Sequence, residues 1–232
     1  MSVIAWVGDS FIWLVFLWGG IALWALWSYY LNTKNSILRE LRKSKSKSIS
    51  SIKNDEYAKV IGSIKDVVNP LNAPLSGRPC VYYHVLIEQE IKNGWKKIID
   101  DKKAQDFFIE ANGEMAIVRT NDAKEEKTRM IYLHTDHTEK SGFLNDASNK
   151  LQNYLRSHGT SSTGLFGLNR SLRYKEGIVA IGEEVVVKGV AQWKSLNEPI
   201  EGFSYSKVLT LSGNSKLKLI ITDLERALEE SR

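Results

Sequence analysis

The sequence predicts a mainly β domain preceded by one membrane-spanning helix. Three observations predict this: an uncharged apolar run near the N-terminus, period-two alternation of apolar residues from residue 57 onward, and tight-turn dipeptides between the alternating runs. We expect a β-rich α+β fold, an antiparallel and partly closed barrel or sandwich, with one inserted helix and a short C-terminal helix. The expected division is 1–33 for the transmembrane helix, 34–56 for a basic juxtamembrane linker and 57–232 for the β-rich domain.

The apolar run extends from Ser10 to Thr33 and contains no charged residue. As a helix, its 24 residues would extend roughly 36 Å, which is enough to cross a bilayer with some tilt. No lysine or arginine precedes the run, and no clear small-residue cleavage site follows it. A cleaved signal peptide therefore fits less well than a retained membrane helix.

Five of the seven tryptophans lie in the first 27 residues. Trp6, Trp13, Gly20 and Trp27 recur every seven residues, so they would share one helix face. An interfacial aromatic belt explains the tryptophans near the two ends of the run but not the deeper ones. Because glycine lets membrane helices approach closely, we hypothesise that this face packs against a second copy of the helix.

A basic segment follows the apolar run, with seven basic residues and one acidic residue between positions 34 and 53. This distribution predicts an N-terminus outside and a cytoplasmic domain, at the inner or plasma membrane if the source is prokaryotic. Anionic lipid headgroups are the expected partners of the basic set: Lys34, Arg39, Arg42, Lys43, Lys45, Lys47 and Lys53. Positions 54–232 hold 25 basic and 25 acidic residues, and this balance argues against nucleic-acid binding.

The alternating runs predict the strands of the domain. Expected strands are 57–67, 80–91, 95–100, 106–111, 114–120, 129–134, 184–192, 206–211 and 217–222, with tight turns at Asn93-Gly94, Asn112-Gly113 and Gly213-Asn214. Helical spacing from Leu144 to His158, followed by Gly159, predicts the inserted helix. Thr222 to Glu225 fits a capping box that would begin the C-terminal helix.

Two sets of residues are candidates for a catalytic or metal site: Cys80 with His84, and His134 with His137. Cys80, the only cysteine, would need a nearby base, but His84 four residues along the same strand would lie about 13 Å away. We therefore expect Cys80 to be a buried packing residue. His134 and His137 could begin a metal site, but no third ligand follows at a recognisable spacing. We expect no catalytic residue, no metal and no cofactor.

Four segments of the domain match a known domain pattern. They are Gly62-Ser-Ile-Lys65, Ala73-Pro-Leu-Ser-Gly-Arg-Pro-Cys-Val-Tyr-Tyr83, Trp95 and the stretch from Arg173 to Ala191. Together they resemble the GIDE-type domain, also called the "beside a membrane" domain, of mitochondrial membrane-anchored ubiquitin ligases and prokaryotic relatives. The resemblance covers about residues 57–222 and implies a membrane-tethered domain that binds ligands or partners near the bilayer.

The sequence departs from those ligases at the catalytic module. A RING finger binds two zinc ions through a set of cysteine and histidine ligands, and one cysteine cannot supply that set. We therefore expect a non-enzymatic, single-pass membrane protein that recruits an unidentified protein partner or senses a ligand. The alternatives are a membrane-associated enzyme or ligase-like component that uses Cys80 or the histidine pair, and a structural subunit of a membrane assembly.

The turn-rich stretch before Cys80 is the expected ligand site, if the domain has one. Pro74 and Pro79 restrict the backbone and Gly77 permits a sharp turn. Arg78 can donate several hydrogen bonds, either to an anionic ligand or to an acceptor within the protein. We therefore predict Ser76, Gly77 and Arg78 as the ligand-binding residues, and an internal carboxylate or carbonyl partner for Arg78 as the alternative.

Overall fold

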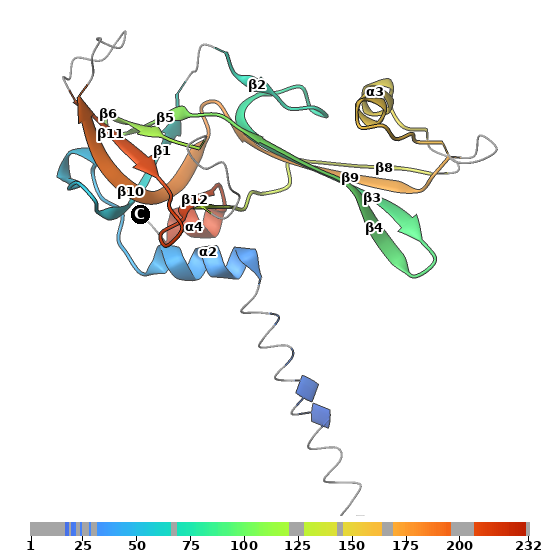
Figure 1. Cartoon of the computed structure of the whole chain (residues 1–232), viewed down its shortest axis with the longest axis horizontal. Coiled ribbons are helices and arrows are strands. Elements are labelled where there is room, and N and C mark those ends of the chain that lie inside the picture. The colour runs from blue at the N-terminus through green and yellow to red at the C-terminus, as the bar shows by residue number, and fades with distance from the viewer. Residues whose placement is uncertain are drawn as a thin grey trace, which may run out of the picture.

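The computed structural model describes residues 17–18, 20–21, 24, 28, 32–65, 69–120, 128–142, 146–163, 169–195 and 207–230. Within these residues the fold is mainly β, as the sequence predicts (Figure 1). The strands are β1 (Tyr57–Ile64), β2 (Leu71–Asn72), β3 (Pro79–Ile91), β4 (Gly94–Ala104), β5 (Phe107–Ala111), β6 (Glu114–Val118), β7 (Arg129–Ile131), β8 (His137–Ser141), β9 (Leu172–Ala180), β10 (Glu184–Ser195), β11 (Lys207–Ser212) and β12 (Leu219–Thr222). The helices are α2 (Thr33–Arg42), a 3₁₀ turn (Ile49–Ser51), α3 (Asn149–Ser157) and α4 (Glu225–Glu229).

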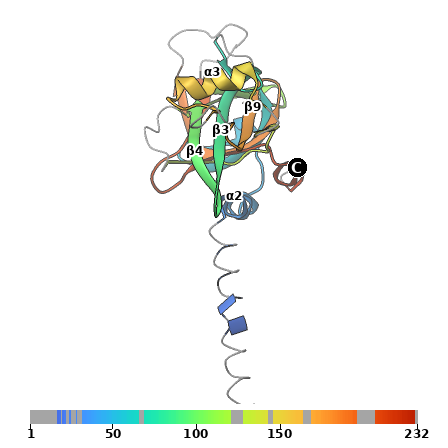
Figure 2. The same ribbon diagram turned by 90° about the vertical axis from the view of Figure 1, so that its right-hand side faces the viewer.

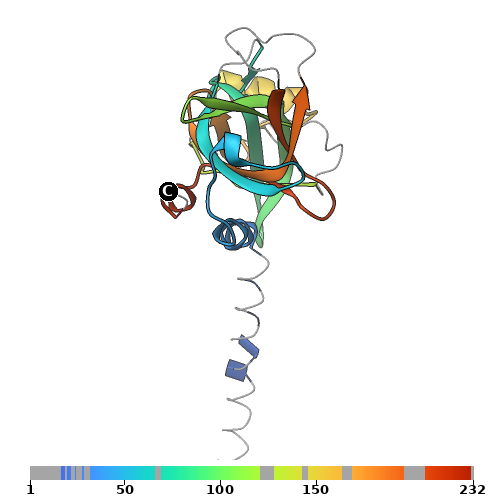
Figure 3. The same cartoon turned by 90° about the vertical axis from the view of Figure 1, so that its left-hand side faces the viewer.

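Five strands close a barrel in the order β1, β5, β6, β11 and β10, and β10 pairs with β1 to complete the ring (Figure 3). Strands β12 and β7 continue the sheet outward from β10. The expected sheet was antiparallel, but β6 pairs with β11 and β7 with β12 in parallel. Apolar residues with almost no exposure fill the interior, among them Val60, Phe107, Ile109, Val187 and Leu209.

Closure of the barrel depends on a glycine in β1. Gly62 lies opposite Val185 of β10, and a Cβ built on it would lie 2.2 Å from the backbone oxygen of Glu110. Atoms that are not bonded cannot approach so closely, so any side chain at this position would push β1 and β5 apart. The absence of a side chain at Gly62 therefore permits the close approach of the chains at this seam.

The second sheet consists of β4, β3, β9 and β8, with the short β2 beside the start of β3. Helix α3 covers one face of this sheet (Figure 2), and its buried Leu151 and Leu155 belong to the same apolar cluster as Val85 and Ile87. Strand β3 joins the two parts of the domain. A register shift between Cys80 and Tyr82 interrupts its regular pairing with β9. Val81 and Tyr82 consequently belong to the barrel core, whereas Cys80 and Tyr83 belong to the cluster under α3.

Helix α2 is seated on the outer face of the barrel. Its buried face packs against strands β10 and β12 and helix α4. Two buried lysines that lie opposite each other on β1 and β10 bind its C-terminal carbonyls: Lys59 Nζ donates to the Leu41 oxygen at 3.0 Å, and Lys188 Nζ to the Glu40 oxygen at 2.9 Å. Part of the expected linker at 34–56 is therefore helical and packs on the barrel.

Most of the predicted membrane segment lies outside the described residues, including Trp6, Trp13 and Trp27. No helix among the residues that the structure describes is both long and apolar enough to cross a membrane. Gly20 is helical, and a Cβ built on it would meet no atom within 4 Å. The described apolar residues nearby are exposed: Leu17, Trp18, Ile21 and Trp24.

Three elements of the domain differ from expectation. The predicted capping box is wrong, because the N-cap of α4 is Leu224, whose side chain makes no cap hydrogen bond. Thr222 Oγ1 donates to the Tyr132 oxygen and accepts the Leu224 N–H at 3.3 Å. The predicted inserted helix is present but shorter, with Ser148 Oγ as its N-terminal cap. Strand β8 was not predicted, because its polar sequence, HTEKS, carries no apolar alternation.

Candidate functional site

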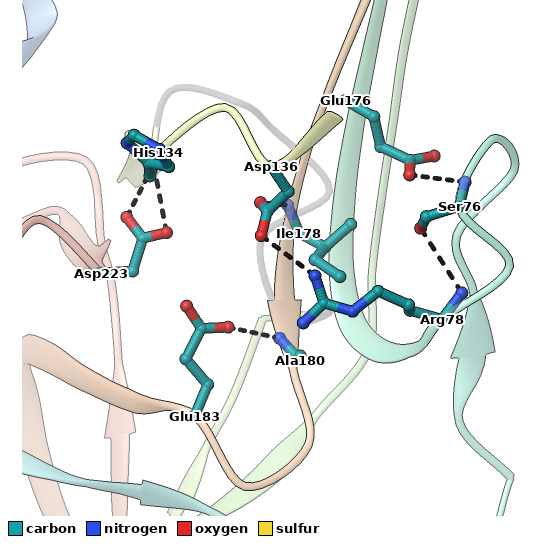
Figure 4. Close-up of polar contacts among 9 residues, drawn as sticks. All are labelled: Ser76, Arg78, His134, Asp136, Glu176, Ile178, Ala180, Glu183 and Asp223. Atoms are coloured by element: carbon teal, nitrogen blue, oxygen red, sulfur yellow. Dashed lines mark hydrogen bonds and ion pairs between the residues drawn. The ribbon is translucent and has the colours of Figure 1, made fainter. Parts of the chain in front are cut away.

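The predicted ligand-binding residues lie in a tight corner between β2 and β3, and Gly77 has a φ of +76° there. The backbone N–H groups of Leu75 and Ser76 donate to the two carboxylate oxygens of Glu176, at 2.7 and 2.8 Å. Figure 4 shows the bond from Ser76. Glu176 lies on β9 and is 0% exposed. A buried carboxylate needs such donors, because an unpaired charge in the interior is costly. The same bonds leave the N–H groups of Leu75 and Ser76 unable to bind a ligand.

Arg78 has an internal carboxylate partner, which is the alternative raised for it from the sequence. Its Nη1 lies 3.2 Å from Asp136 Oδ1, and the other oxygen of Asp136 accepts the Ile178 N–H at 3.0 Å. The arginine side chain is 52% exposed, so one side of the guanidinium faces solvent. Ser76 Oγ accepts the Arg78 N–H at 3.4 Å. The corner is thus tied to β9 and to the segment before β8 by two carboxylates.

Cys80 begins the strand that leaves this corner and is 0% exposed. Burial, together with the nearby charge of Glu176, raises the pKa of its thiol to about 11. His84 does not act on the thiol, because it lines a cavity away from the Cys80 cluster and its Nε2 lies 2.6 Å from Asp100 Oδ1. A neutral, buried thiol without a base has the properties of a packing residue.

Two further carboxylates lie near the corner. Burial raises the pKa of Glu183, and the charges of Asp223 and Asp136 add to this effect. Burial likewise raises the pKa of Asp223, although a hydrogen bond from the His134 N–H at 2.8 Å favours its charged form. Glu183 in turn accepts the Ala180 N–H at 2.7 Å. Figure 4 shows these carboxylates and Asp136 around the turn between β9 and β10.

The two histidines considered for a metal site do not form one with any described group. His134 lines the cavity described below, while His137 lies in β8 with its Nε2 3.6 Å from Glu139 Oε2. Among the residues that the structure describes, no group of three or more histidine, cysteine, aspartate or glutamate side chains could hold a metal ion.

A cavity of about 800 Å³ lies between the β3–β9 face and the start of α2. Four cationic side chains line it: Lys102 of β4, Arg129 of β7, Lys175 of β9 and Lys218 before β12. None of its described lining residues is an aspartate or glutamate. Asn32, whose side chain accepts the Lys34 N–H at 2.9 Å, places the N-terminus of α2 in the wall. The wall therefore combines four positive charges with the positive end of a helix dipole.

Asp100, a carboxylate beside the cavity, is already shared among several basic groups. Burial opposes the charge on Asp100, but hydrogen bonds from Lys97 and His84 outweigh burial and lower its pKa. Lys102 lies 3.8 Å from the same carboxylate, and Arg129 donates to the Thr120 oxygen at 3.1 Å. One carboxylate divided among three basic groups cannot neutralise the four cations of the cavity. The cavity is therefore suited to an anion.

The residues predicted to meet lipid headgroups have several partners inside the chain. Arg42 forms two hydrogen bonds of 2.7 Å with Glu230, Lys43 pairs with Glu40 at 2.6 Å, and Lys47 pairs with Glu56. The other four are Lys34 and Lys45, which are exposed, Arg39, which donates to Ser36 Oγ at 3.1 Å, and Lys53, whose N–H donates to Glu56. Lipid contact by this set stays a prediction.

No family model, no curated protein and no solved structure matches this chain. The resemblance to the GIDE-type domain therefore stays a prediction from the quoted residues.

Sequence reasoning missed both Glu176 and the cavity. Glu176 had a detectable signal, because it alternates with Leu172, Tyr174 and Ile178 on one face of β9, where an acid is out of place. The cavity had no such signal. Its four cations come from four separate strands or loops, and each alone looks like an ordinary surface residue.

Proposed function

We propose that this protein is a membrane-anchored, non-enzymatic module that binds a phosphate-bearing anion beside the bilayer. The observation that carries the proposal is the cavity at the start of α2, with four cationic side chains and no carboxylate among its described lining residues. Lysine and arginine are the usual ligands of phosphate groups. An anion in the cavity would relieve the mutual repulsion of these four groups.

Membrane anchoring is supported by the uncharged run that ends at Thr33, directly before α2 and the cavity. The exposed Leu17, Trp18, Ile21 and Trp24 would be covered by lipid in such an arrangement. The basic residues that follow favour a cytoplasmic domain. The resemblance to the GIDE-type domain, whose members are tethered beside membranes, fits the same proposal.

The absence of catalysis is part of the proposal. A buried Cys80 thiol with a raised pKa and no base supports it, as does the separate placement of His134 and His137. The barrel order, numbered along the chain, is 1-2-3-5-4, a five-stranded Greek-key arrangement resembling the OB-fold. Many OB-folds bind oligonucleotides, but shared architecture does not assign function, and the charge-balanced domain argues against nucleic acid.

The test measures anion binding by the full chain in detergent, with inorganic phosphate and pyrophosphate as probes and chloride at equal ionic strength as the reference. We expect the probes to raise the melting temperature. Replacing two cavity lysines together, Lys175→Gln and Lys218→Gln, should weaken binding at least about tenfold, a loss of about 1.4 kcal/mol. Lys103→Gln is the matched control, since Lys103 follows Lys102 on β4 and does not line the cavity.

A second arm separates free anions from lipid headgroups. Vesicles of phosphatidylcholine with and without phosphatidic acid are compared for protection of the reconstituted protein against thermal unfolding. Equal affinity of the double variant and the Lys103→Gln control for every probe would contradict the proposal. Protection by phosphatidic acid without any effect of soluble phosphate would assign the cavity to a lipid.

A further inference from the structure

The β3–β4 hairpin extends beyond the sheet to which it belongs. Pairing of β3 with β9 ends at Gln89, whereas pairing of β3 with β4 continues through Ile91 and Gly94. Among the described residues the tip is therefore a two-stranded ribbon with no third strand beside it. Such a ribbon has little stability of its own, so an exposed apolar tip is a feature that requires a covering surface.

The tip, residues 91–97, has the sequence IKNGWKK, and all seven residues are exposed. Ile91 is 46% exposed and Trp95 is 37% exposed. Three lysines accompany them, Lys92, Lys96 and Lys97, and the seven residues include no acid. Tryptophan and isoleucine suit the interfacial zone of a bilayer, and lysine suits anionic headgroups. The composition of the tip therefore matches the surface of an anionic membrane.

The tryptophan is held in place from the side of the sheet. Arg173 of β9 lies with its Cζ 4.4 Å from the centre of the Trp95 ring, and its Nε lies 2.5 Å from Glu88 Oε2. This cation–π contact restrains the orientation of the Trp95 ring. The indole is therefore presented in one orientation, which lowers the entropy cost of inserting it into another phase.

The tip lies at the same end of the domain as α2. In Figures 1 and 2 the β3–β4 ribbon and α2 occupy the same edge of the domain, and α3 lies at the opposite edge. The uncharged run ends at Thr33, the first residue of α2. A bilayer that holds this run would consequently face the hairpin tip as well.

We propose that the tip of the β3–β4 hairpin docks into the surface of an anionic bilayer, as a second membrane contact beside the anchor. Trp95 and Ile91 enter the interfacial zone, and Lys92 and Lys96 meet anionic headgroups, while Lys97 pairs with Asp100 at 2.5 Å. Two contacts fix the tilt of the barrel, and with it the direction in which the basic cavity opens. The inference rests on the membrane anchoring in the proposed function, but not on the ligand of the cavity.

The experiment places one fluorophore at a time on the full chain in vesicles. Asn93→Cys labels the tip, Lys34→Cys labels the start of α2, and Asn153→Cys labels the exposed side of α3; the buried Cys80 of the parent chain controls for background labelling. Each label is exposed to lipids that carry a spin-label quencher, in phosphatidylcholine with and without phosphatidylglycerol. We expect several-fold stronger quenching at Asn93 and Lys34 than at Asn153, and more quenching at Asn93 with the anionic lipid.

Further variants separate docking from mere proximity. Trp95→Ser with Ile91→Ser should reduce the quenching at Asn93 several-fold and leave that at Lys34 unchanged. Strong quenching at Lys34 with none at Asn93 would overturn the inference and leave the anchor intact. Absence of quenching at Lys34 would overturn the anchor and the inference together. Shielding of the Asn93 label from aqueous iodide only in native membranes, without quenching by lipid, would assign the tip to a protein partner instead.

Discussion

The corner at Ser76–Arg78 and the basic cavity both present groups that bind anions, but they differ in what those groups already contact. At the corner, Glu176 takes the backbone donors and Asp136 takes the arginine. In the cavity, four cations face a wall without a carboxylate among its described residues. Residue type alone therefore does not identify a ligand site. The balance of charge among the residues that line the site is the more informative quantity.

The largest effect on stability is expected from removing Glu176, which accepts hydrogen bonds from two backbone N–H groups of the corner. Glu176→Ala would leave the N–H groups of Leu75 and Ser76 without an acceptor and should lower the free energy of unfolding by about 2–5 kcal/mol. Urea unfolding of the full chain in detergent, followed by near-ultraviolet circular dichroism, measures the change. The exposed Glu90 on β3 is the matched control, and Glu90→Ala should change stability by less than about 0.5 kcal/mol. Equal losses for the two variants would mean that Glu176 does not hold the corner.

The surroundings of Glu176 also show how much of the structure could be predicted from the sequence. The alternation of apolar residues located most strands, and the Asn112-Gly113 turn is confirmed by positive φ angles of 54° and 79°. Proline and glycine around Ser76 correctly indicated a sharp corner. The partner of Arg78 could not be named, because Asp136 lies 58 residues away and its contact depends on how the second sheet meets the barrel. Barrel closure and the parallel pairs likewise follow from contacts between distant strands, which local patterns do not encode.

The cavity also could not be predicted from local sequence patterns. The sequence placed the anion site at the corner because proline, glycine and arginine are adjacent there. The cationic wall is assembled from β4, β7, β9 and the loop before β12, so no short motif contains it. The alternation rule assigns Lys102 and Lys175 to the polar faces of their strands, but it does not show that those faces meet.

An intermediate effect is expected at Arg78, and it tests which of the two regions binds the anion. Arg78→Gln should lower the free energy of unfolding by about 1 kcal/mol or less, because half of the side chain is exposed and its pairing with Asp136 is screened by water. Phosphate affinity should not change, since the cavity is untouched. Calorimetric titration of the variant beside the Lys175→Gln and Lys218→Gln chain measures this. If Arg78→Gln weakens binding as much as the cavity variant does, the ligand binds at the corner, as the sequence first suggested.

The smallest effect is expected at Glu183, in the turn between β9 and β10, where burial and the charges of Asp223 and Asp136 raise the pKa of the carboxyl. Its pKa is raised in the folded state, so the stability it contributes is present below the unfolded value near 4.5 and is lost as the pH rises through the folded value. Glu183→Gln removes the titrating group and keeps an oxygen to accept the Ala180 N–H. The variant should therefore gain stability relative to the parent between pH 4.5 and 7, by less than about 1 kcal/mol. Melting temperatures of both chains across this range measure the gain. A parent that loses no stability relative to the variant would show that neither burial nor the charges of Asp223 and Asp136 disfavour the ionised Glu183 carboxylate.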